Sequence, residues 1–207
     1  HPDACAQAGA AFEDGTGVTA DLARAADLYR RGCASHHAES CRRIGVMQLL
    51  GAGMPQDLAQ ARVNLQTACE AHNARSCFDL ARMYERGVGT SEDFERARRW
   101  LTAGCEGGYA PACTRMGRML SGSDTDRERR EASSFFTRGC RAAELDAEAC
   151  TALGDMHAEG RGVARDLVHA ARQYERACEH DDIVGCERLG SLLREGADGV
   201  AADARRA

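Results

Sequence analysis

The sequence contains no lysine, since all 27 of its basic residues are arginine. The chain therefore has no Ser-x-x-Lys acyl-transfer motif, no Schiff-base lysine and no phosphate-binding P-loop lysine. Gly-x-Ser-x-Gly, the Cys-x2-Cys redox motif and the Cys-x2-Cys-His haem-attachment motif are also absent. These absences remove many of the catalytic and cofactor-binding classes that a short motif can reveal.

Long apolar runs and aromatic residues are scarce as well. No stretch of about 18 or more apolar residues occurs, so the sequence predicts no membrane-spanning helix. Aromatic residues make up 5% of the chain, and we expect the single tryptophan, Trp100, to serve packing. The net charge of −5 implies no general affinity for nucleic acid or anionic membranes.

The sequence is rich in cysteine, which recurs at a fixed interval. Six cysteines follow one another at steps of 36, 36, 36, 37 and 36 residues: Cys5, Cys41, Cys77, Cys113, Cys150 and Cys186. A second set keeps a similar interval: Cys33, Cys69, Cys105, Cys140 and Cys178. A period of this size indicates an array of stacked units, each of which packs mainly on its neighbours.

The period also predicts the domain organisation. We expect a single repeat domain over residues 1–207. Its units would lie at about 5–40, 41–76, 77–112, 113–149 and 150–185, with a partial unit at 186–207. Because the chain starts at His1 and stops within the sixth unit, we expect a fragment that is truncated at both ends.

Each unit has the pattern of two helices joined by a glycine turn. In the third unit Cys77, Leu80, Ala81 and Tyr84 occupy positions i, i+3, i+4 and i+7, which is one face of an amphipathic helix. The residue four places after the cysteine is usually glycine, which would permit close backbone approach where two helices cross.

Glycine and aspartate mark the expected helix ends. Glycine tolerates the left-handed conformation that follows a helix, and five first helices are expected to end at Gly15, Gly51, Gly87, Gly160 and Gly196. Aspartate favours the start of a helix, and four second helices are expected to begin at Asp21, Asp57, Asp93 and Asp166.

The paired cysteines favour disulfides and an oxidising compartment. The expected pairs are Cys33/Cys41, Cys69/Cys77, Cys105/Cys113, Cys140/Cys150 and Cys178/Cys186, and the period places a partner for Cys5 upstream of His1. Zinc is the alternative, because Cys33-x2-His36-His37-x3-Cys41 holds four nominal ligands. The third unit keeps the cysteine spacing without any histidine, so we expect disulfides, with no metal and no cofactor.

The repeated pattern resembles a known family. Leu-Gly-x2-Tyr-x2-Gly-x-Gly-Val-x2-Asp-x3-Ala-x2-Tyr, which recurs from Cys5 to Ala207, is similar to the Sel1-like repeat, a relative of the tetratricopeptide repeat. The added Cys-x7-Cys resembles the Helicobacter cysteine-rich proteins within that family. The resemblance implies an all-α fold: a right-handed α/α superhelical solenoid of helix pairs, here cross-linked by disulfides.

The resemblance also implies a binding face on the first helices, at positions one, five and eight residues after each cysteine. These positions are Arg42, Phe78 and Thr114, then Val46, Arg82 and Arg118, then Leu49, Glu85 and Ser121. Among them Arg42, Phe78, Arg82 and Arg118 are the candidate binding residues, since guanidinium groups fork onto carboxylates and a phenyl ring anchors apolar groups. One alternative is that arginine is simply the default surface cation of a chain without lysine. In another, the loop residues His36, His37 and Tyr109 form the contact edge instead.

We therefore expect a non-catalytic protein- or peptide-binding scaffold that is periplasmic, associated with the outer envelope or secreted. Its partner would be acidic or bear a carboxylate, and no nucleic-acid partner is expected. The resemblance also implies an alternative, because cysteine-rich members of the family have been regarded as penicillin-binding or slow β-lactamase proteins. In that alternative the chain would bind a β-lactam or a peptidoglycan fragment, with weak hydrolase activity.

Overall fold

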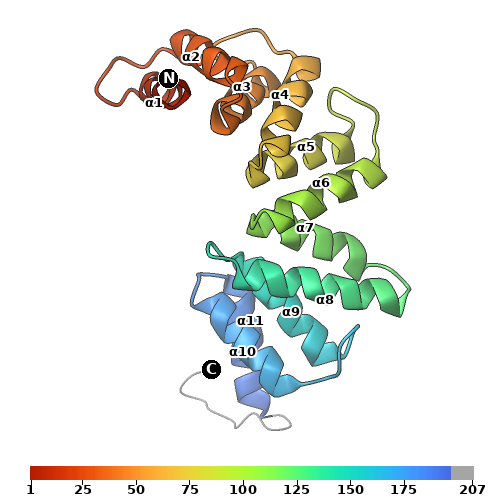
Figure 1. Ribbon diagram of the computed structural model, residues 1–207. Coiled ribbons are helices and arrows are strands. Elements are labelled where there is room, and N and C mark those ends of the chain that lie inside the picture. The colour runs from red at the N-terminus through yellow and green to blue at the C-terminus, as the bar shows by residue number, and fades with distance from the viewer. Residues whose placement is uncertain (197–207) are drawn as a thin grey trace. The chain divides into compact units, whose positions relative to one another are not determined.

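The computed structural model describes residues 1–196, and every regular element within them is an α-helix (Figure 1). The first helices of the repeats are α1 (Pro2–Asp14), α3 (Ala38–Leu50), α5 (Ala74–Arg86), α7 (Ala110–Ser121), α9 (Ala147–Glu159) and α11 (Ile183–Glu195). The second helices are α2 (Leu22–Ala34), α4 (Leu58–Glu70), α6 (Phe94–Glu106), α8 (Asp126–Arg141) and α10 (Leu167–Cys178). The part of the expected sixth unit that follows residue 196 lies outside the described residues.

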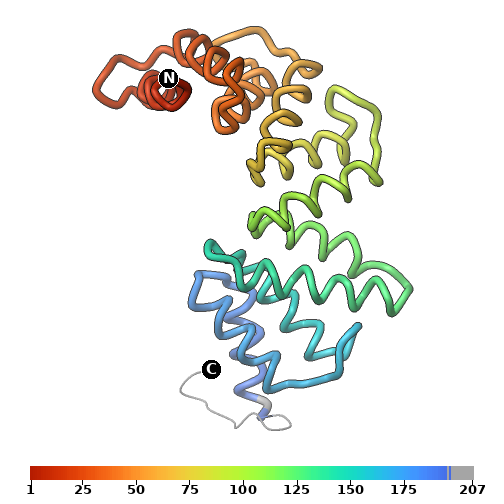
Figure 2. Tube along the Cα trace, in the orientation of Figure 1, coloured from red at the N-terminus to blue at the C-terminus, as the bar shows by residue number. Residues whose placement is uncertain are grey.

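The helices group into two compact units, His1–Gly107 and Gly108–Ala207. Within the first unit α1 packs on α2, α3 on α4 and α5 on α6, and each pair stacks on the next through its second helix. Within the second unit α7 pairs with α8 and α9 with α10, while α8 contacts α9 and α10 contacts α11 (Figure 2). The predicted all-α fold of stacked helix pairs is confirmed.

The second helices start where the aspartates predicted. Asp21, Asp57, Asp93 and Asp166 are the N-cap residues of α2, α4, α6 and α10. Each carboxylate accepts a hydrogen bond from the main-chain N–H three residues later, which satisfies one of the donors that a helix start leaves unpaired.

The first helices end at the predicted glycines. Gly15, Gly51, Gly87 and Gly160 are left-handed C-caps with φ of 73°, 70°, 63° and 71°, and Gly196 caps α11 with φ of 57°. The fourth unit departs from this pattern, because α7 ends at Gly122 with φ of −79°.

The small residue four places after the cysteine lies where the second helix approaches the first most closely. A Cβ atom placed on Gly45 would lie 2.9 Å from Leu65 Cγ, and one on Gly154 would lie 2.5 Å from the ring of Tyr174. Gly9 and Gly117 accommodate Tyr29 and Phe136 in the same way. A large side chain of the second helix thus makes the nearest approach, and at Gly45 the main-chain oxygen of Ala61 in α4 would also lie 3.3 Å from the added Cβ atom.

The core continues from one helix pair to the next, because each cluster joins the second helix of one pair to the pair that follows it. In the first unit Leu65, Leu80 and Tyr84 form one buried cluster with two alanines and Met83, and Trp100 packs against its edge. Tyr29, Ile44 and Met47 form a second cluster with Ala25 and Ala26. Among the described residues, no helix is both long enough and apolar enough to cross a membrane.

Candidate functional site: the faces of the first helices

The row of predicted binding residues nearest the cysteines lies mostly in the packed interior. Arg42 is 7% exposed and Thr114 is 3% exposed, and the Thr114 hydroxyl donates to the carbonyl of Ala110. Phe78 is half-buried, with the Arg82 guanidinium 5.8 Å from its ring centroid. This row therefore contributes packing and leaves little surface for a ligand.

Arg42 is held by a carboxylate on its own helix. Its Nε and Nη2 donate to the two oxygens of Glu39 at 2.9 and 2.6 Å, and Arg43 Nε donates to the same carboxylate at 2.8 Å. Asn73, the N-cap of α5, adds a fourth donor at 3.1 Å. Burial alone would raise the pKa of Glu39, but the hydrogen bonds from Arg42 and Arg43 lower it to about 2. Glu39 thus holds Arg42 on α3 and joins α3 to the start of α5 through Asn73.

The next two rows line a pocket in the first unit. The arginine-rimmed pocket, as we name it, has a volume of about 370 Å³ and is lined by Val46, Leu49, Leu50, Asp79, Arg82, Met83, Arg86 and Val88. Its apolar wall comes from α3, where Leu50 is 69% exposed, and its charged wall comes from α5. Three of the sequence-derived positions, Val46, Leu49 and Arg82, meet here.

The arginines of this pocket form no ion pair among the described residues. Both of them, Arg82 and Arg86, are exposed. Arg75 and Asp79 continue the same stripe of α5, at intervals of four and three residues, which places all four side chains on one face of the helix. Asp79 accepts no hydrogen bond from the described residues, and burial raises its pKa above the usual value although nearby guanidinium groups oppose the shift.

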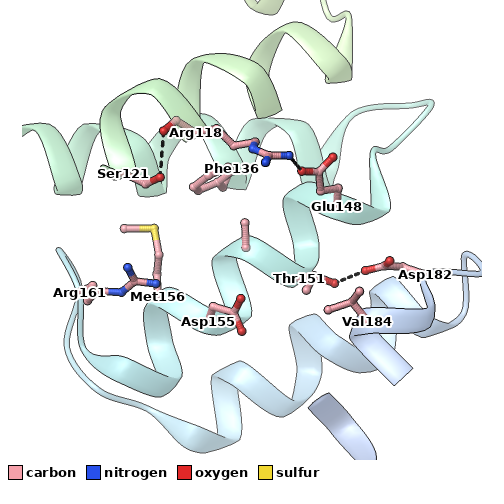
Figure 3. A pocket seen from close by; sticks show the side chains of 11 residues that line it. Arg118, Ser121, Phe136, Glu148, Thr151, Asp155, Met156, Arg161, Asp182 and Val184 are labelled. Carbon is pink, nitrogen blue, oxygen red and sulfur yellow. Dashed lines mark hydrogen bonds and ion pairs between the residues drawn. The ribbon is translucent and has the colours of Figure 1, made fainter. Parts of the chain in front are cut away.

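A second pocket lies in the second unit, on α7, α9 and α11 (Figure 3). The ion-paired pocket, as we name it, has a volume of about 500 Å³ and is lined by Arg118, Ser121, Phe136, Glu148, Thr151, Ala152, Asp155, Met156, Arg161, Asp182 and Val184. Arg118 and Ser121, both predicted from the sequence, lie on its α7 side.

Most charges in the ion-paired pocket are already matched. Arg118 pairs with Glu148, and Arg161 pairs with Glu159. Asp155 accepts from the Tyr174 hydroxyl at 2.8 Å, and burial together with this bond raises the pKa of Tyr174. Its polar side chains are therefore engaged with one another, in contrast to those of the arginine-rimmed pocket.

A third pocket lies on the side of α2 and α4, and three of its nine lining residues carry amide side chains. It measures about 520 Å³, and Gln48, Gln60 and Asn64 form a hydrogen-bonded chain within it. None of Arg42, Phe78, Arg82 and Arg118 lies there, whereas His36 of the alternative contact edge lines it.

The cysteines pair as the spacing predicted. Disulfides join Cys33 to Cys41, Cys69 to Cys77, Cys140 to Cys150 and Cys178 to Cys186; Cys105 and Cys113 are also disulfide-bonded, and Cys5 is free. Of the two histidines that suggested zinc, His36 occupies a left-handed turn position with φ of 58°, as His72 does in the next repeat with φ of 64°, and His37 is the N-cap of α3. Among residues 1–196, no group of three or more histidine, cysteine or acidic side chains is placed to hold a metal ion.

Five lining residues of the arginine-rimmed pocket were not predicted from the sequence: Leu50, Asp79, Met83, Arg86 and Val88. Asp79 and Arg86 follow Arg75 at i+4 and i+11, so the helical period of α5 carried a signal for them. The sequence carried no such signal for Leu50, because an apolar residue at the end of a first helix is expected to lie in the core.

The geometry is shared with known proteins. The Sel1 repeat family model matches residues 2–37, 38–73, 74–109, 110–143, 147–182 and 183–207, which is nearly the whole chain. The chain belongs to the Sel1 repeat family. Each matched Sel1 repeat begins three residues before the cysteine of its first helix, because that helix starts before the cysteine.

Solved structures show the same Sel1 repeat fold. The protective antigen c5321 of uropathogenic Escherichia coli is 23% identical over 99% of this chain, with a TM-score of 0.89, and this chain spans 44% of that longer chain. A Sel1 repeat protein from Oxalobacter formigenes is 23% identical over 100% of this chain and 84% of that chain, with a TM-score of 0.85. The immunity protein Pa5087 from Pseudomonas aeruginosa is 16% identical over 99% of this chain and 74% of that chain, with a TM-score of 0.55.

The cysteine-rich group also occurs among the similar structures. Helicobacter pylori cysteine rich protein B is 19% identical over 84% of this chain and 99% of that chain, and its TM-score of 0.36 supports no inference about this chain. A comparison with curated proteins finds no significant match.

Proposed function

We propose that this Sel1 repeat chain is a non-catalytic scaffold that binds a protein or peptide partner through the faces of its first helices. The observation that supports it is the position of the two pockets that include predicted binding residues. Both lie on first helices, and both are lined at positions five and eight residues after the repeat cysteine. Shallow pockets that combine apolar and charged side chains are typical of surfaces that recognise peptides.

An oxidising location is part of the proposal. Ten cysteines in disulfides suit the periplasm, the outer envelope or the secreted space, where thiols are oxidised, and do not suit a reducing cytosol. A partner for this scaffold would then be a protein or peptide of the same compartment.

The hypothesis that the chain hydrolyses β-lactams has less support from the residues that line the pockets. Ser121 lines the ion-paired pocket, but its hydroxyl donates to the carbonyl of Arg118 at 3.1 Å rather than to a base. A serine nucleophile needs an adjacent general base to become reactive. An experiment can therefore distinguish the scaffold hypothesis from the β-lactam hydrolase hypothesis.

The test combines one activity assay with one binding assay. Incubation with a chromogenic β-lactam should give no turnover above background; turnover that a single substitution abolishes would overturn the scaffold proposal. Capture of envelope proteins from the source cells should weaken for Arg82→Ala with Arg118→Ala while the melting temperature is unchanged. Because Arg118 is already paired with Glu148, we expect Arg82→Ala alone to account for most of the loss.

A further inference from the structure

We propose that the arginine-rimmed pocket binds an extended acidic segment of a partner protein, in which carboxylate side chains alternate with apolar ones. This inference rests on the proposed function and names the partner's chemistry. The pocket has a charged wall and an apolar wall. The charged wall would bind the carboxylates of the segment, and the apolar wall would bind its apolar side chains.

The charged wall selects carboxylates. Arg75, Asp79, Arg82 and Arg86 give this face of α5 a formal charge of +2, on a chain whose net charge is −5. An arginine without an internal partner keeps its N–H donors for a ligand, and a guanidinium binds a carboxylate through two parallel hydrogen bonds. Neither Arg82 nor Arg86 forms a hydrogen bond or an ion pair among the described residues, although the Arg82 guanidinium also lies 5.8 Å from the centroid of the Phe78 ring. Arg118 and Arg161 of the ion-paired pocket are each paired with a glutamate.

The spacing of the arginines fits an extended chain. Arg82 and Arg86 are four residues apart on a helix, which corresponds to a rise of about 6 Å. In an extended peptide, residues i and i+2 lie about 6.6 Å apart and their side chains point to the same side. Carboxylates at alternate positions of such a peptide would therefore face both arginines at once.

The apolar wall takes the side chains between those carboxylates. Val46, Leu49 and Leu50 of α3 lie across the pocket from the α5 stripe, and Leu50 is 69% exposed although it is a leucine. Apolar side chains that face α3 would remove this surface from water, which is favourable in proportion to the area buried.

Asp79 supplies the reason to expect an extended rather than a helical segment. Its carboxylate lines the pocket and has no hydrogen-bond donor among the described residues. An extended peptide carries free main-chain N–H groups that can donate to this carboxylate, whereas the N–H groups of a helix are used internally. A carboxylate and an apolar wall in the same pocket also disfavour a nucleic-acid backbone, which offers acceptors and no main-chain donors.

Fluorescence anisotropy with four short labelled peptides tests the inference on the full disulfide-bonded chain. The first alternates glutamate and leucine; the second replaces glutamate by glutamine, the third replaces leucine by serine, and the fourth replaces glutamate by arginine. We expect the first to bind, and each of the other three to bind weaker by about tenfold or more. Methylation of the main-chain nitrogens that would face Asp79 should weaken the first peptide as well.

Matched variants assign the binding to this pocket. Arg82→Glu with Arg86→Glu should reduce the affinity for the first peptide by about tenfold or more and restore binding of the arginine peptide. Arg31→Glu with Arg99→Glu makes the same change in net charge at exposed arginines of α2 and α6 outside the pocket, and should leave the affinity unchanged. Leu49→Asp tests the apolar wall.

The outcomes separate this inference from the proposed function. Equal binding of the glutamate and glutamine peptides, or no effect of the double reversal at Arg82 and Arg86, would overturn the acidic partner. If the glutamine or arginine peptide binds instead and Leu49→Asp abolishes it, the scaffold remains and only the partner's charge is wrong. If no peptide binds and an oligonucleotide does, both proposals fail at this pocket.

Discussion

At the scale of single residues, Glu39 is the acceptor on which α3 and α5 converge. It takes hydrogen bonds from Arg42, Arg43 and Asn73, and its pKa falls to about 2 from a usual 4.5. Because the folded pKa is the lower one, the stabilisation is complete above about pH 4.5 and is lost as the pH falls towards about 2.

Glu39→Gln should remove that acid-sensitive contribution. We expect the free energy of unfolding at pH 7 to fall by about 1 to 2 kcal/mol, with the value kept low because Glu39 is more than a third exposed. The variant should also lose less stability than the parent chain on acidification. Urea unfolding at neutral and acid pH measures both effects, and parallel pH profiles for the two proteins would contradict the assignment.

His157 is a second residue whose surroundings make it sensitive to pH. Its ring lies 4.3 Å from that of His169, and its Nδ1 is buried without a hydrogen-bond partner. The matching pairs in the first and third repeats are a cation over an aromatic ring: Arg24 over Phe12 and Arg96 over Tyr84. Burial, and next the proximity of His169, lower the pKa of His157, while Asp166 and a hydrogen bond with the Ala164 main chain oppose the shift.

The sign of the pH effect follows from that lowered pKa. The unfolded chain takes up a proton at a higher pH than the folded chain, so stability is full above about pH 6.5 and falls as the pH drops through and below that value. His157→Tyr, which restores the ring of the third repeat, should flatten this part of the profile. Melting temperatures at about pH 7.5 and about pH 5.5 give the measurement, and His180→Tyr in an exposed loop is the control.

At the scale of the helices, the loop glycines hold one repeat against the previous one. Gly89, with φ of 68°, would place a Cβ atom 2.6 Å from Leu58 Cβ and 3.0 Å from the Leu58 carbonyl oxygen, at the start of α4. Gly53 meets Leu22 and Gly162 meets Arg129 in the same way. Gly17 holds the equivalent place in the first repeat, where nothing lies within 4 Å.

This difference provides a matched pair of substitutions. Gly17→Ala should cost only the left-handed backbone strain, about 1 kcal/mol. Gly89→Ala adds the overlap with α4 and should cost about 1 to 3 kcal/mol more. Chemical denaturation of both variants measures the difference; equal losses would show that the loop does not press on the preceding helix.

At the scale of the whole molecule, the sequence predicted what depends on local signals. The period fixed the helix pairs, and the aspartate and glycine caps act within three or four residues of their own position, so they could be read from the sequence. The burial of Arg42 could not, because it depends on Asn73 of the next repeat and on the packing of α3 against α5. Arg118 pairs with Glu148, which lies 30 residues away in the sequence, whereas Arg82 and Arg86 form no ion pair among the described residues. Local sequence patterns therefore predicted the repeated helix pairs, whereas only the structure shows which arginines are paired with a carboxylate.

The disulfides decide whether the whole chain is stable. Each of the bridges Cys33–Cys41, Cys69–Cys77 and Cys178–Cys186 spans a sequence separation of 8. Closing a loop of about nine residues removes roughly 2.6 kcal/mol of unfolded-state entropy in the chain-entropy model. Ten disulfide-bonded cysteines then contribute on the order of 10 kcal/mol, which matches the entire stability of an ordinary domain of about 5 to 15 kcal/mol.

Cys69→Ala with Cys77→Ala should therefore lower the free energy of unfolding by about 2 to 3 kcal/mol. Cys5→Ala is the control, because Cys5 is a free cysteine, and it should change the stability by less than about 0.5 kcal/mol. Full reduction should lower the melting temperature far more than either substitution, since all bridges are lost together. Thermal melts with and without reductant, with intact-mass analysis to count the bridges, provide the measurement. A melting temperature that reduction leaves unchanged would remove the physical reason for placing this scaffold in an oxidising compartment.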